Sequence, residues 1–395
     1  MGSPPIRTIT LGVAEPHPIA PRVVSEAVAR LRRAEAGFRN AGYEVQTVRL
    51  STRAVFADMA DRKPDEIVSY AHSLQRVLDD LGVAFCSLGP APAADPGFPL
   101  DRLDAIADLL VGAPSIICTV QLGTAEHGVR AEAAPYAALV IRRLADETPE
   151  GFGNFNFAGL ACVEPGGPFF PAAYHDGPET FTIGLQGASV ARAALEGLDG
   201  PGSSEAPAPE EITTRTRDAL TRAATPVIAL AGELAERIGT PFGGIDLSPA
   251  PAGEDSIAAA LESCVGAPIG SPGTLTAAAA LTRGIQTTGL PTRGYNGLML
   301  PVMEDVLLAR RWAERHVNAQ QLLAYSAVCG TGLDTVPLPG DATRDQLARL
   351  LLDVATLAVR LRKPLSARLF PVPGTISGDR TAFTSPYLVN TVTGW

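Results

Sequence analysis

Apolar positions recur along this chain with two alternating periods. Segments of ten or more residues with apolar side chains every three or four positions predict amphipathic helices, and the short apolar runs between them predict buried strands. The predicted helices cover 22–40, 65–81, 100–111, 130–146, 211–238, 255–263, 273–284 and 343–361. The predicted strands are YEVQTVRL (43–50), GVAFCSLG (82–89), SIICTVQLG (115–123), FNFAGLACVE (155–164), GGIDLS (243–248), GLMLPV (297–302) and LSARLFPV (365–372).

This alternation predicts parallel strand pairing with the helices outside the sheet. At this length we expect an α/β fold, a large closed α/β barrel that covers residues 1–395 as a single domain. One segment, GLDGPGSSEAPAPEE at 197–211, interrupts the rhythm because it is rich in Gly, Pro and Ser. The alternation has the same character on both sides of it, so we interpret the segment as a flexible surface insertion.

The composition argues against several classes of protein. Apolar residues make up 46% of the 395 residues, and 42 Asp and Glu outnumber 32 Lys and Arg. This acidic balance argues against a nucleic-acid partner, and no apolar run reaches the ~18 residues that would indicate a membrane span. The five cysteines lack CxxC spacing, which indicates reduced thiols in a cytoplasmic protein. Without Walker, dinucleotide or metal-binding motifs, we expect no cofactor and no metal.

In α/β folds, polar side chains gather just past the carboxyl ends of strands, and this sequence has four such places. They are YHDG (174–177), IDLSPAPAGEDS (245–256), LPVMED (300–305) and AVCGTGLDT (327–335). His175 titrates near neutral pH and is a candidate general acid or base; the alternative is a turn histidine satisfied by the backbone. Asp246 lies between two apolar residues on a buried strand, where a carboxylate requires a partner or a chemical role.

The other polar residues of these places each have a structural alternative. Ser256 or Asp255 is suited to cap the helix that follows. Glu304 and Asp305 stand in a first helical turn, where the helix dipole favours acidic side chains. Cys329 precedes a flexible Gly-Thr-Gly stretch, so it is either a nucleophile or a packed thiol.

In their order along the chain, several motifs resemble a bacterial and archaeal family of uncharacterised proteins, catalogued as domain of unknown function seven hundred and eleven. The motifs are RTITLGV, AYHDG, FGGIDLSPAPAGEDSIAAALE, LPVMED, AVCGTGLDTVPLPGD and LAVRLRKPLSARLFPVPG. The resemblance implies a fold similar to pyruvate formate-lyase, a ten-stranded α/β barrel of two antiparallel halves. The family pattern is matched at His175, Asp246, Ser248, Asp255, Ser256, Glu304, Asp305, Cys329, Asp334, Lys363 and Arg368.

Departures from the family pattern bear on the chemistry. Ile117 stands where relatives have a cysteine, and Cys118 lies one place further on. In a strand, one place means the opposite face, so we do not expect a two-cysteine mechanism. Thr384 and Ser385 replace a glycine pair of the relatives, and TRGYNG (292–297) stands too far from the C-terminus to be a glycyl-radical loop. We therefore exclude radical chemistry.

These residues suggest an enzyme of lyase or isomerase type that acts on a small anionic metabolite without an organic cofactor. Proton transfer next to a carbonyl would lead to isomerisation, elimination or carbon–carbon cleavage. His175 or Asp246 would move the proton, and Cys329 would act as nucleophile or second acid. The substrate-binding residues would be Ser248, Glu304, Asp334, Lys363 and Arg368, with the last two holding a carboxylate. The alternative is a metabolite-binding regulatory protein that works with an amino-acid-sensing partner. We expect a homodimer.

Overall fold

The structure, a computed structural model, describes residues 4–198 and 208–395. Its central feature is one ten-stranded, mostly parallel sheet. Neighbouring strands follow the order β8 (Phe242–Asp246), β7 (Thr180–Leu185), β1 (Ile6–Gly12), β2 (Val45–Ser51), β3 (Cys86–Ala91), β4 (Ile116–Thr124), β6 (Gly159–Ala161), β10 (Leu365–Val372) and β9 (Gly332–Pro339). The two-residue strand β5 (Gly128–Val129) pairs with β4 off this path.

The strands of the sheet run in two opposed sets. β1, β2, β3, β4 and β6 are parallel to one another. β7 pairs antiparallel to β1 and β10 antiparallel to β6, and each has a parallel outer neighbour, β8 and β9 respectively. The predicted mixed α/β fold is therefore confirmed, and strands from both sides of residues 199–207 belong to the same sheet.

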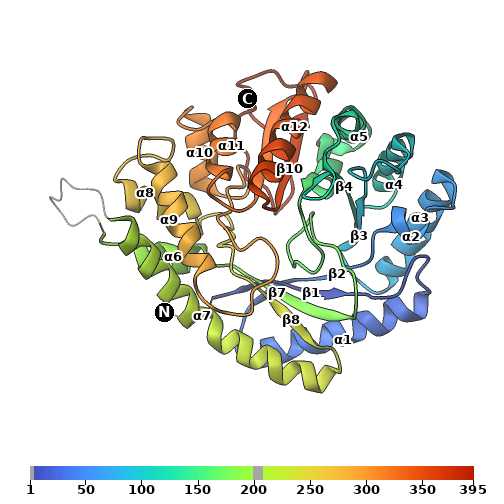
Figure 1. Cartoon of the computed structure of the whole chain (residues 1–395), viewed down its shortest axis with the longest axis horizontal. Helices are drawn as coiled ribbons and strands as arrows, with labels where there is room; N and C mark the ends of the chain where they lie inside the picture. The colour runs from blue at the N-terminus through green and yellow to red at the C-terminus, as the bar shows by residue number, and fades with distance from the viewer. Residues whose placement is uncertain (1–3, 199–207) are drawn as a thin grey trace.

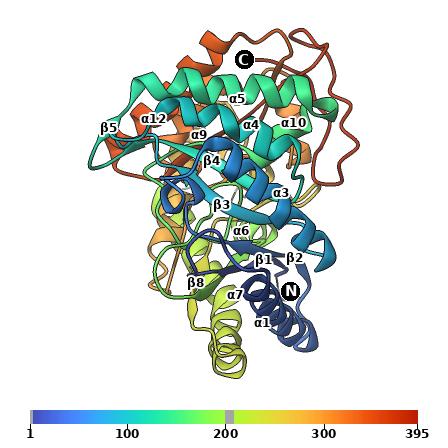
Figure 2. The same ribbon diagram turned by 90° about the vertical axis from the view of Figure 1, so that its right-hand side faces the viewer.

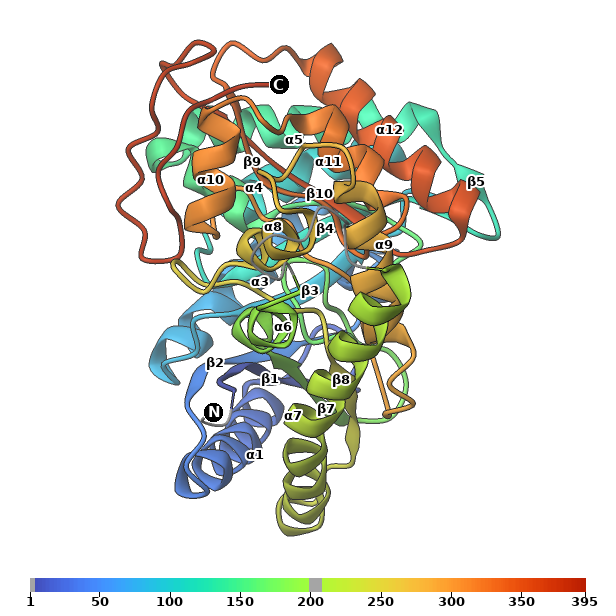
Figure 3. The same ribbon diagram turned by 90° about the vertical axis from the view of Figure 1, so that its left-hand side faces the viewer.

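Helices surround the strands on the outside (Figure 1). They are α1 (Pro21–Asn40), α2 (Val55–Asp58), α3 (Pro64–Asp80), α4 (Ala105–Val111), α5 (Ala134–Glu147), α6 (Ala188–Leu195), α7 (Pro209–Ile238), α8 (Ile257–Val265), α9 (Thr274–Gln286), α10 (Val306–Ala313), α11 (Ala319–Ser326) and α12 (Arg344–Leu361), with short 3-10 turns at Leu100–Asp104, Ala131–Ala133 and Pro149–Asn156. Figure 2 shows the side covered by α3, α4 and α5, and Figure 3 shows the opposite side, covered by α6, α7, α8 and α9.

Several helices begin where their sequence supplies a cap. The hydroxyl of Ser256 accepts a hydrogen bond from the N–H of Ala259, which confirms Ser256 as the predicted N-cap of α8. The Asp305 carboxylate accepts hydrogen bonds from first-turn N–H groups of both α8 and α10, so one side chain fixes two helix ends. Thr343 and Gln346 form a reciprocal capping box at α12.

The segment 291–302 lies between β8 and β9, the two ends of the sheet path. Thr292 forms a parallel bridge with Ile245 of β8, and Pro301 forms one with Asp334 of β9. Within residues 4–198 and 208–395, β8 and β9 do not pair directly, so strand pairing does not close the sheet. Closure into a barrel stays a prediction.

The strand predicted at 297–302 is wrong, because no regular strand forms there. Asn296 adopts a left-handed conformation with φ of 48°, and the N–H of Gly297 donates to the hydroxyl of Ser248 instead of to a strand carbonyl. Gly297 also packs directly on Gly330, where a Cβ would lie 2.4 Å from the Cα of Gly297. Side-chain acceptors and this close backbone approach replace the ladder that the apolar pattern predicts.

A hydrophobic core joins the sheet to helices from both halves of the chain, including α1 and α7. Gly37 of α1 allows this contact, because a Cβ there would lie 2.3 Å from a methyl carbon of Leu234 on α7. Of the predicted insertion 197–211, residues 199–207 lie outside the described residues, and Pro209 already begins α7. In the part of the chain that the structure describes, no helix combines the length and the apolar character that a bilayer crossing requires.

Candidate functional site

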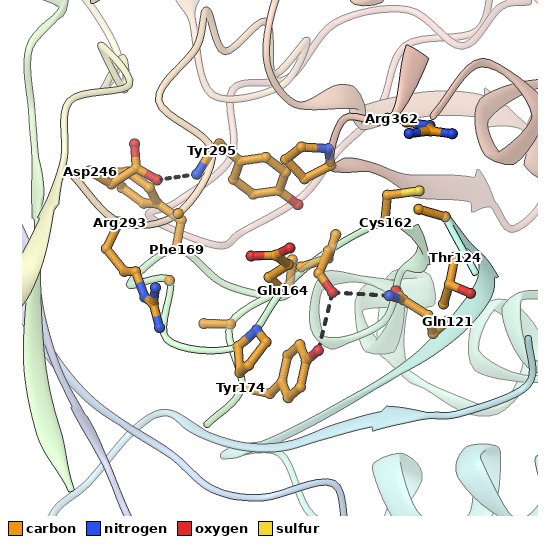
Figure 4. Close-up of a pocket in the computed structure, with 18 of the residues that line it drawn as sticks. Gln121, Thr124, Cys162, Glu164, Phe169, Tyr174, Asp246, Arg293, Tyr295 and Arg362 are labelled. Atoms are coloured by element: carbon orange, nitrogen blue, oxygen red, sulfur yellow. Dashed lines mark hydrogen bonds between the residues drawn. The ribbon is translucent and has the colours of Figure 1, made fainter. Parts of the chain in front are cut away.

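Two cavities adjoin at the ring of Phe169, which lines both. We call one of them the arginine cavity. It has a volume of about 310 Å³ and includes Arg49 and Arg368 in its wall. The tyrosine cavity, the second, has a volume of about 530 Å³ and includes Tyr174 and Tyr295 (Figure 4). Each volume falls within the range usual for small-molecule sites.

The arginine cavity lies at the amino-terminal ends of β1 and β2, and β9 and β10 contribute to its wall. Thr47 and Arg49 share one face of β2, because side chains two positions apart in a strand point the same way. Val48 and Leu50 belong to the hydrophobic core instead. The alternation of β2 therefore directs its arginine, Arg49, toward the cavity.

Three of the predicted substrate-binding residues meet in the arginine cavity as an ion-pair network. Arg368 donates from Nε to Oδ1 of Asp334 at 2.7 Å and from Nη2 to Oε1 of Glu304. Arg7 of β1 donates to the other oxygen of Glu304 at 2.9 Å. Burial opposes the charge on Arg368, but the two carboxylates raise the pKa of Arg368 overall. Glu304, Asp334 and Arg368 therefore lie together, and Arg368 is already paired within the protein; their role in substrate binding stays a prediction.

Arg49 is the cation of this cavity that lacks a carboxylate partner. It is 9% exposed, and among the described residues no carboxylate oxygen lies within 4.0 Å of its guanidinium. Its Nε donates to the hydroxyl of Thr47 at 3.1 Å, and its guanidinium carbon lies 5.3 Å and 5.0 Å from the ring centres of Phe85 and Phe170. Burial, together with the nearby Arg7, lowers the pKa of Arg49 to about 9. Arg49 is therefore still a cation at neutral pH.

Asp246 is fully buried at the end of β8, where it contributes to the wall of the tyrosine cavity. Its carboxylate accepts hydrogen bonds from the N–H and hydroxyl of Ser248 at 2.9 and 2.6 Å, and from the N–H groups of Tyr295 and Asn296 at 2.7 and 3.1 Å; Figure 4 shows the bond to Tyr295. Burial raises the pKa of Asp246 although these bonds oppose it. Both oxygens are occupied, so Asp246 and Ser248 hold the 294–297 turn in place.

His175 contributes to the wall of neither cavity. It is 3% exposed and packs against Gly12, where a Cβ would lie 2.0 Å from Nδ1. Nε2 donates to the carbonyl of Pro178 at 3.0 Å, and Nδ1 has no hydrogen-bond partner within residues 4–198 and 208–395. Burial lowers the pKa of His175, which keeps the ring neutral at pH 7. This geometry corresponds to the turn-histidine alternative.

Cys329 and Lys363 also contribute to neither cavity wall. Lys363 donates from Nζ to the carbonyls of Ser326 and Cys329, just past the end of α11, so its charge is engaged by a helix C-terminus. Burial raises the pKa of the Cys329 thiol to about 11, although Lys363 opposes the shift. At neutral pH the thiol is protonated and packed, and it is a poor nucleophile.

Two further cysteines flank the cavities. Ile117 lines the arginine cavity, while the thiol of Cys118 donates to the carbonyl of Gly89 at 3.6 Å on the other face of β4. Cys162 lines the tyrosine cavity in a left-handed conformation with φ of 53°, and burial raises the pKa of its thiol. The expected separation of Ile117 and Cys118 onto opposite faces is confirmed.

The tyrosine cavity lies past the carboxyl ends of β4 and β6. The amide of Gln121 and the hydroxyl of Tyr174 both donate to the carbonyl of Val163, at 3.0 and 3.1 Å (Figure 4). Arg293 and Glu164 are exposed to solvent. The two donors share the carbonyl of Val163, whereas Oε1 of Gln121 is buried without a hydrogen-bond partner among the described residues.

Sequence reasoning missed Arg7 and Arg49 because it searched the carboxyl ends of strands, and both stand on the strands themselves. A signal for Arg49 existed, since an arginine between Val48 and Leu50 in a buried strand requires compensation. A metal centre is not indicated: in residues 4–198 and 208–395 no cluster of three or more His, Cys, Asp or Glu side chains is placed to hold an ion.

The fold and the cavities define a mixed α/β protein with a charged interior site, and comparison with known sequences places it in a family. The family profile described as "Uncharacterised ACR (DUF711)" matches residues 3–384, so the chain belongs to this family. The UPF0210 protein of Desulforudis audaxviator is 30% identical over 403 residues, which cover 96% of this chain and 88% of the relative. The UPF0210 protein of Pyrobaculum aerophilum is 36% identical over 292 residues, 70% of this chain but only 61% of that relative.

Proposed function

We propose that this protein binds a small organic anion in the arginine cavity, with Arg49 as the ionic contact. A single observation carries the proposal: Arg49 is a buried cation that has no carboxylate partner in the described part of the chain, whereas Arg7 and Arg368 beside it are paired. An uncompensated buried charge costs free energy in the absence of ligand. A bound anion would remove that cost, and this gives the ligand an electrostatic reason to bind there.

We further propose that the segment 291–302 closes the sheet into a barrel, with the arginine cavity in its interior. The parallel bridges of Thr292 to β8 and of Pro301 to β9 support this arrangement. Side chains from β1, β2, β9 and β10 line the cavity together, as expected for strands that face one another across an interior.

The reaction we propose is proton transfer next to a carbonyl of the bound anion. Of the groups that line the arginine cavity, Glu304 and Asp334 are carboxylates placed to accept a proton. The second candidate function is metabolite binding without chemistry, as in a regulatory protein. It is favoured by the fact that Arg368 already engages both carboxylates.

Titration calorimetry with acetate, pyruvate, benzoate and inorganic phosphate tests the binding site. At least one anion should bind the wild-type protein roughly 30-fold more tightly than Arg49→Met, because losing a buried charge-assisted contact costs ~2 kcal/mol or more. Arg293→Met, the same substitution at an exposed arginine of the tyrosine cavity, is the control and should leave the affinity unchanged. Equal affinities of wild type and Arg49→Met for every anion would contradict the proposal.

Proton transfer is tested separately by following the methyl protons of pyruvate in D₂O by NMR. Exchange faster than the uncatalysed rate, lost in Glu304→Gln or Asp334→Asn, supports the enzyme. Binding of pyruvate without accelerated exchange supports the regulatory candidate.

A further inference from the structure

The charge of the arginine cavity selects the charge of its ligand. The guanidinium groups of Arg7, Arg49 and Arg368 face the carboxylates of Glu304 and Asp334, which leaves one positive charge among the groups that are largely shielded from solvent. A third carboxylate of the wall, that of Glu44, is exposed to solvent, where its charge is screened. Among the described residues, Arg7, Arg368, Glu304 and Asp334 form ion pairs with one another, and Arg49 forms none. A ligand with a single negative charge therefore balances the cavity, whereas a dianion would place its second charge near two buried carboxylates, and such like-charge contacts are strongly unfavourable.

The contacts of Arg49 determine which part of the guanidinium a ligand can reach. Its Nε–H is taken by Thr47, and the rings of Phe85 and Phe170 lie against the guanidinium. The N–H groups of its two terminal nitrogens have no partner among the described residues. This edge is a planar fork, and a planar carboxylate matches it with two parallel hydrogen bonds.

The rest of the cavity is small, and its wall combines a large apolar part with the polar side chains of Glu44, Gln46, Asn156 and Tyr387. Away from the charged network, the wall is formed largely by Phe85, Ile117, Phe155, Phe169, Phe170 and Met299. Such side chains contact the hydrocarbon part of a ligand favourably and offer it no hydrogen bonds. The volume of about 310 Å³ stands at the lower end of the range for ligand pockets, which restricts the ligand to a small molecule.

From these three features we propose that the ligand is a small monocarboxylate with an apolar or aromatic body, rather than a phosphate ester or a dicarboxylate. This inference rests on the proposed function, because it assigns the chemical class of the anion that Arg49 contacts. It adds two requirements to that function: the anion carries one charge, and the remainder of the molecule is apolar.

The test compares four probes of related shape by titration calorimetry at pH 8. Benzoate is the planar monoanion, phenylphosphonate is its largely dianionic tetrahedral counterpart, benzamide is its neutral counterpart, and acetate carries the charge without the apolar body. We expect benzoate to bind at least about tenfold more tightly than each of the other three. In Arg49→Met, benzoate should fall to the affinity of benzamide, and Arg293→Met should behave as wild type. Arg49→Gln takes the place of Arg49→Met if that variant does not fold.

The outcomes separate the ligand class from the site. If phenylphosphonate binds as tightly as benzoate, and both depend on Arg49, the single-charge requirement is wrong while the anion site stands. If acetate binds as tightly as benzoate, and both depend on Arg49, the requirement for an apolar body is wrong while the anion site stands. If neither anion loses affinity in Arg49→Met, the ligand class and the proposed anion site both fail.

Discussion

The arginine cavity and the tyrosine cavity each contain a buried charge, and the protein treats these two charges in opposite ways. Asp246, in the wall of the tyrosine cavity, receives four hydrogen bonds from three residues of its own chain. Arg49, in the wall of the arginine cavity, receives no carboxylate at all from the described residues, although two stand nearby. Both side chains are buried, so burial alone does not distinguish their roles.

Asp246 and Arg49 differ in the groups that compensate their charges. The partners of Asp246 are the N–H and hydroxyl groups of Ser248 and the N–H groups of Tyr295 and Asn296, so the folded chain already compensates its charge. Arg49 has aromatic rings and one hydroxyl around it, and its terminal nitrogens face a cavity. A charge that the fold satisfies stabilises the fold, whereas a charge that the fold leaves unsatisfied is available to a ligand.

Two matched substitutions in the arginine cavity give the largest expected contrast. Arg368→Met should lower the free energy of unfolding by ~3–5 kcal/mol, because it leaves Asp334 without an ion-pair partner among the described residues and leaves Glu304 with Arg7 alone. Arg49→Met should raise it by ~1–2 kcal/mol in the absence of ligand, because it removes an uncompensated cation. Urea unfolding of both variants measures the difference. Destabilisation by Arg49→Met as large as that by Arg368→Met would show that Arg49 is structural.

Asp246→Asn tests the satisfied charge. The substitution should cost roughly 2–4 kcal/mol of stability, because an amide group cannot accept all four hydrogen bonds and turns its own donors toward N–H groups. Thermal and urea unfolding measure this loss. Benzoate affinity in the arginine cavity should change less than about threefold. If the variant has wild-type stability but no longer binds benzoate, Asp246 serves ligand binding and not the stability of the fold.

The pH dependence of anion binding follows from Arg49. Its pKa is lowered from the ordinary 12.5 to about 9 in the folded protein, so the guanidinium is charged below pH 9 and loses its proton as the pH rises through 9. Benzoate affinity should be constant from pH 7 to about 8.5 and then fall by up to about tenfold per pH unit. Calorimetry between pH 7 and 10.5 measures it. If the benzoate affinity does not change across this range, a cation other than Arg49 binds the anion.

Ser256→Ala is expected to have the smallest effect. It removes the N-cap of α8 and a 2.7 Å hydrogen bond to Asp305, and should lower the free energy of unfolding by ~1 kcal/mol. Neither cavity includes Ser256 in its wall, so benzoate affinity should equal that of wild type. A change in benzoate affinity would indicate that the amino-terminal end of α8 affects binding in the arginine cavity.

Much of the secondary structure could be predicted from the apolar pattern. The predicted helices 22–40, 65–81 and 211–238 correspond to Pro21–Asn40, Pro64–Asp80 and Pro209–Ile238, because a long amphipathic period is a strong local signal. The pattern failed at 297–302, where the N–H of Gly297 donates to the hydroxyl of Ser248, a residue just past the end of β8. A partner so far away in the sequence leaves no periodic trace.

The candidate site divides in the same way. The sequence by itself determined that charged residues stand in buried strands, that Ser256 or Asp255 caps a helix, and that the chain belongs with a family of this residue pattern. Only the tertiary structure decided that Ser256 is the cap, that Arg368, Glu304 and Asp334 satisfy one another, and that Arg49 has no carboxylate partner among the described residues. The physical reason is that the cost of a buried charge depends on the groups that surround it in space, and the fold brings those groups together from residues that are between 34 and 297 positions apart.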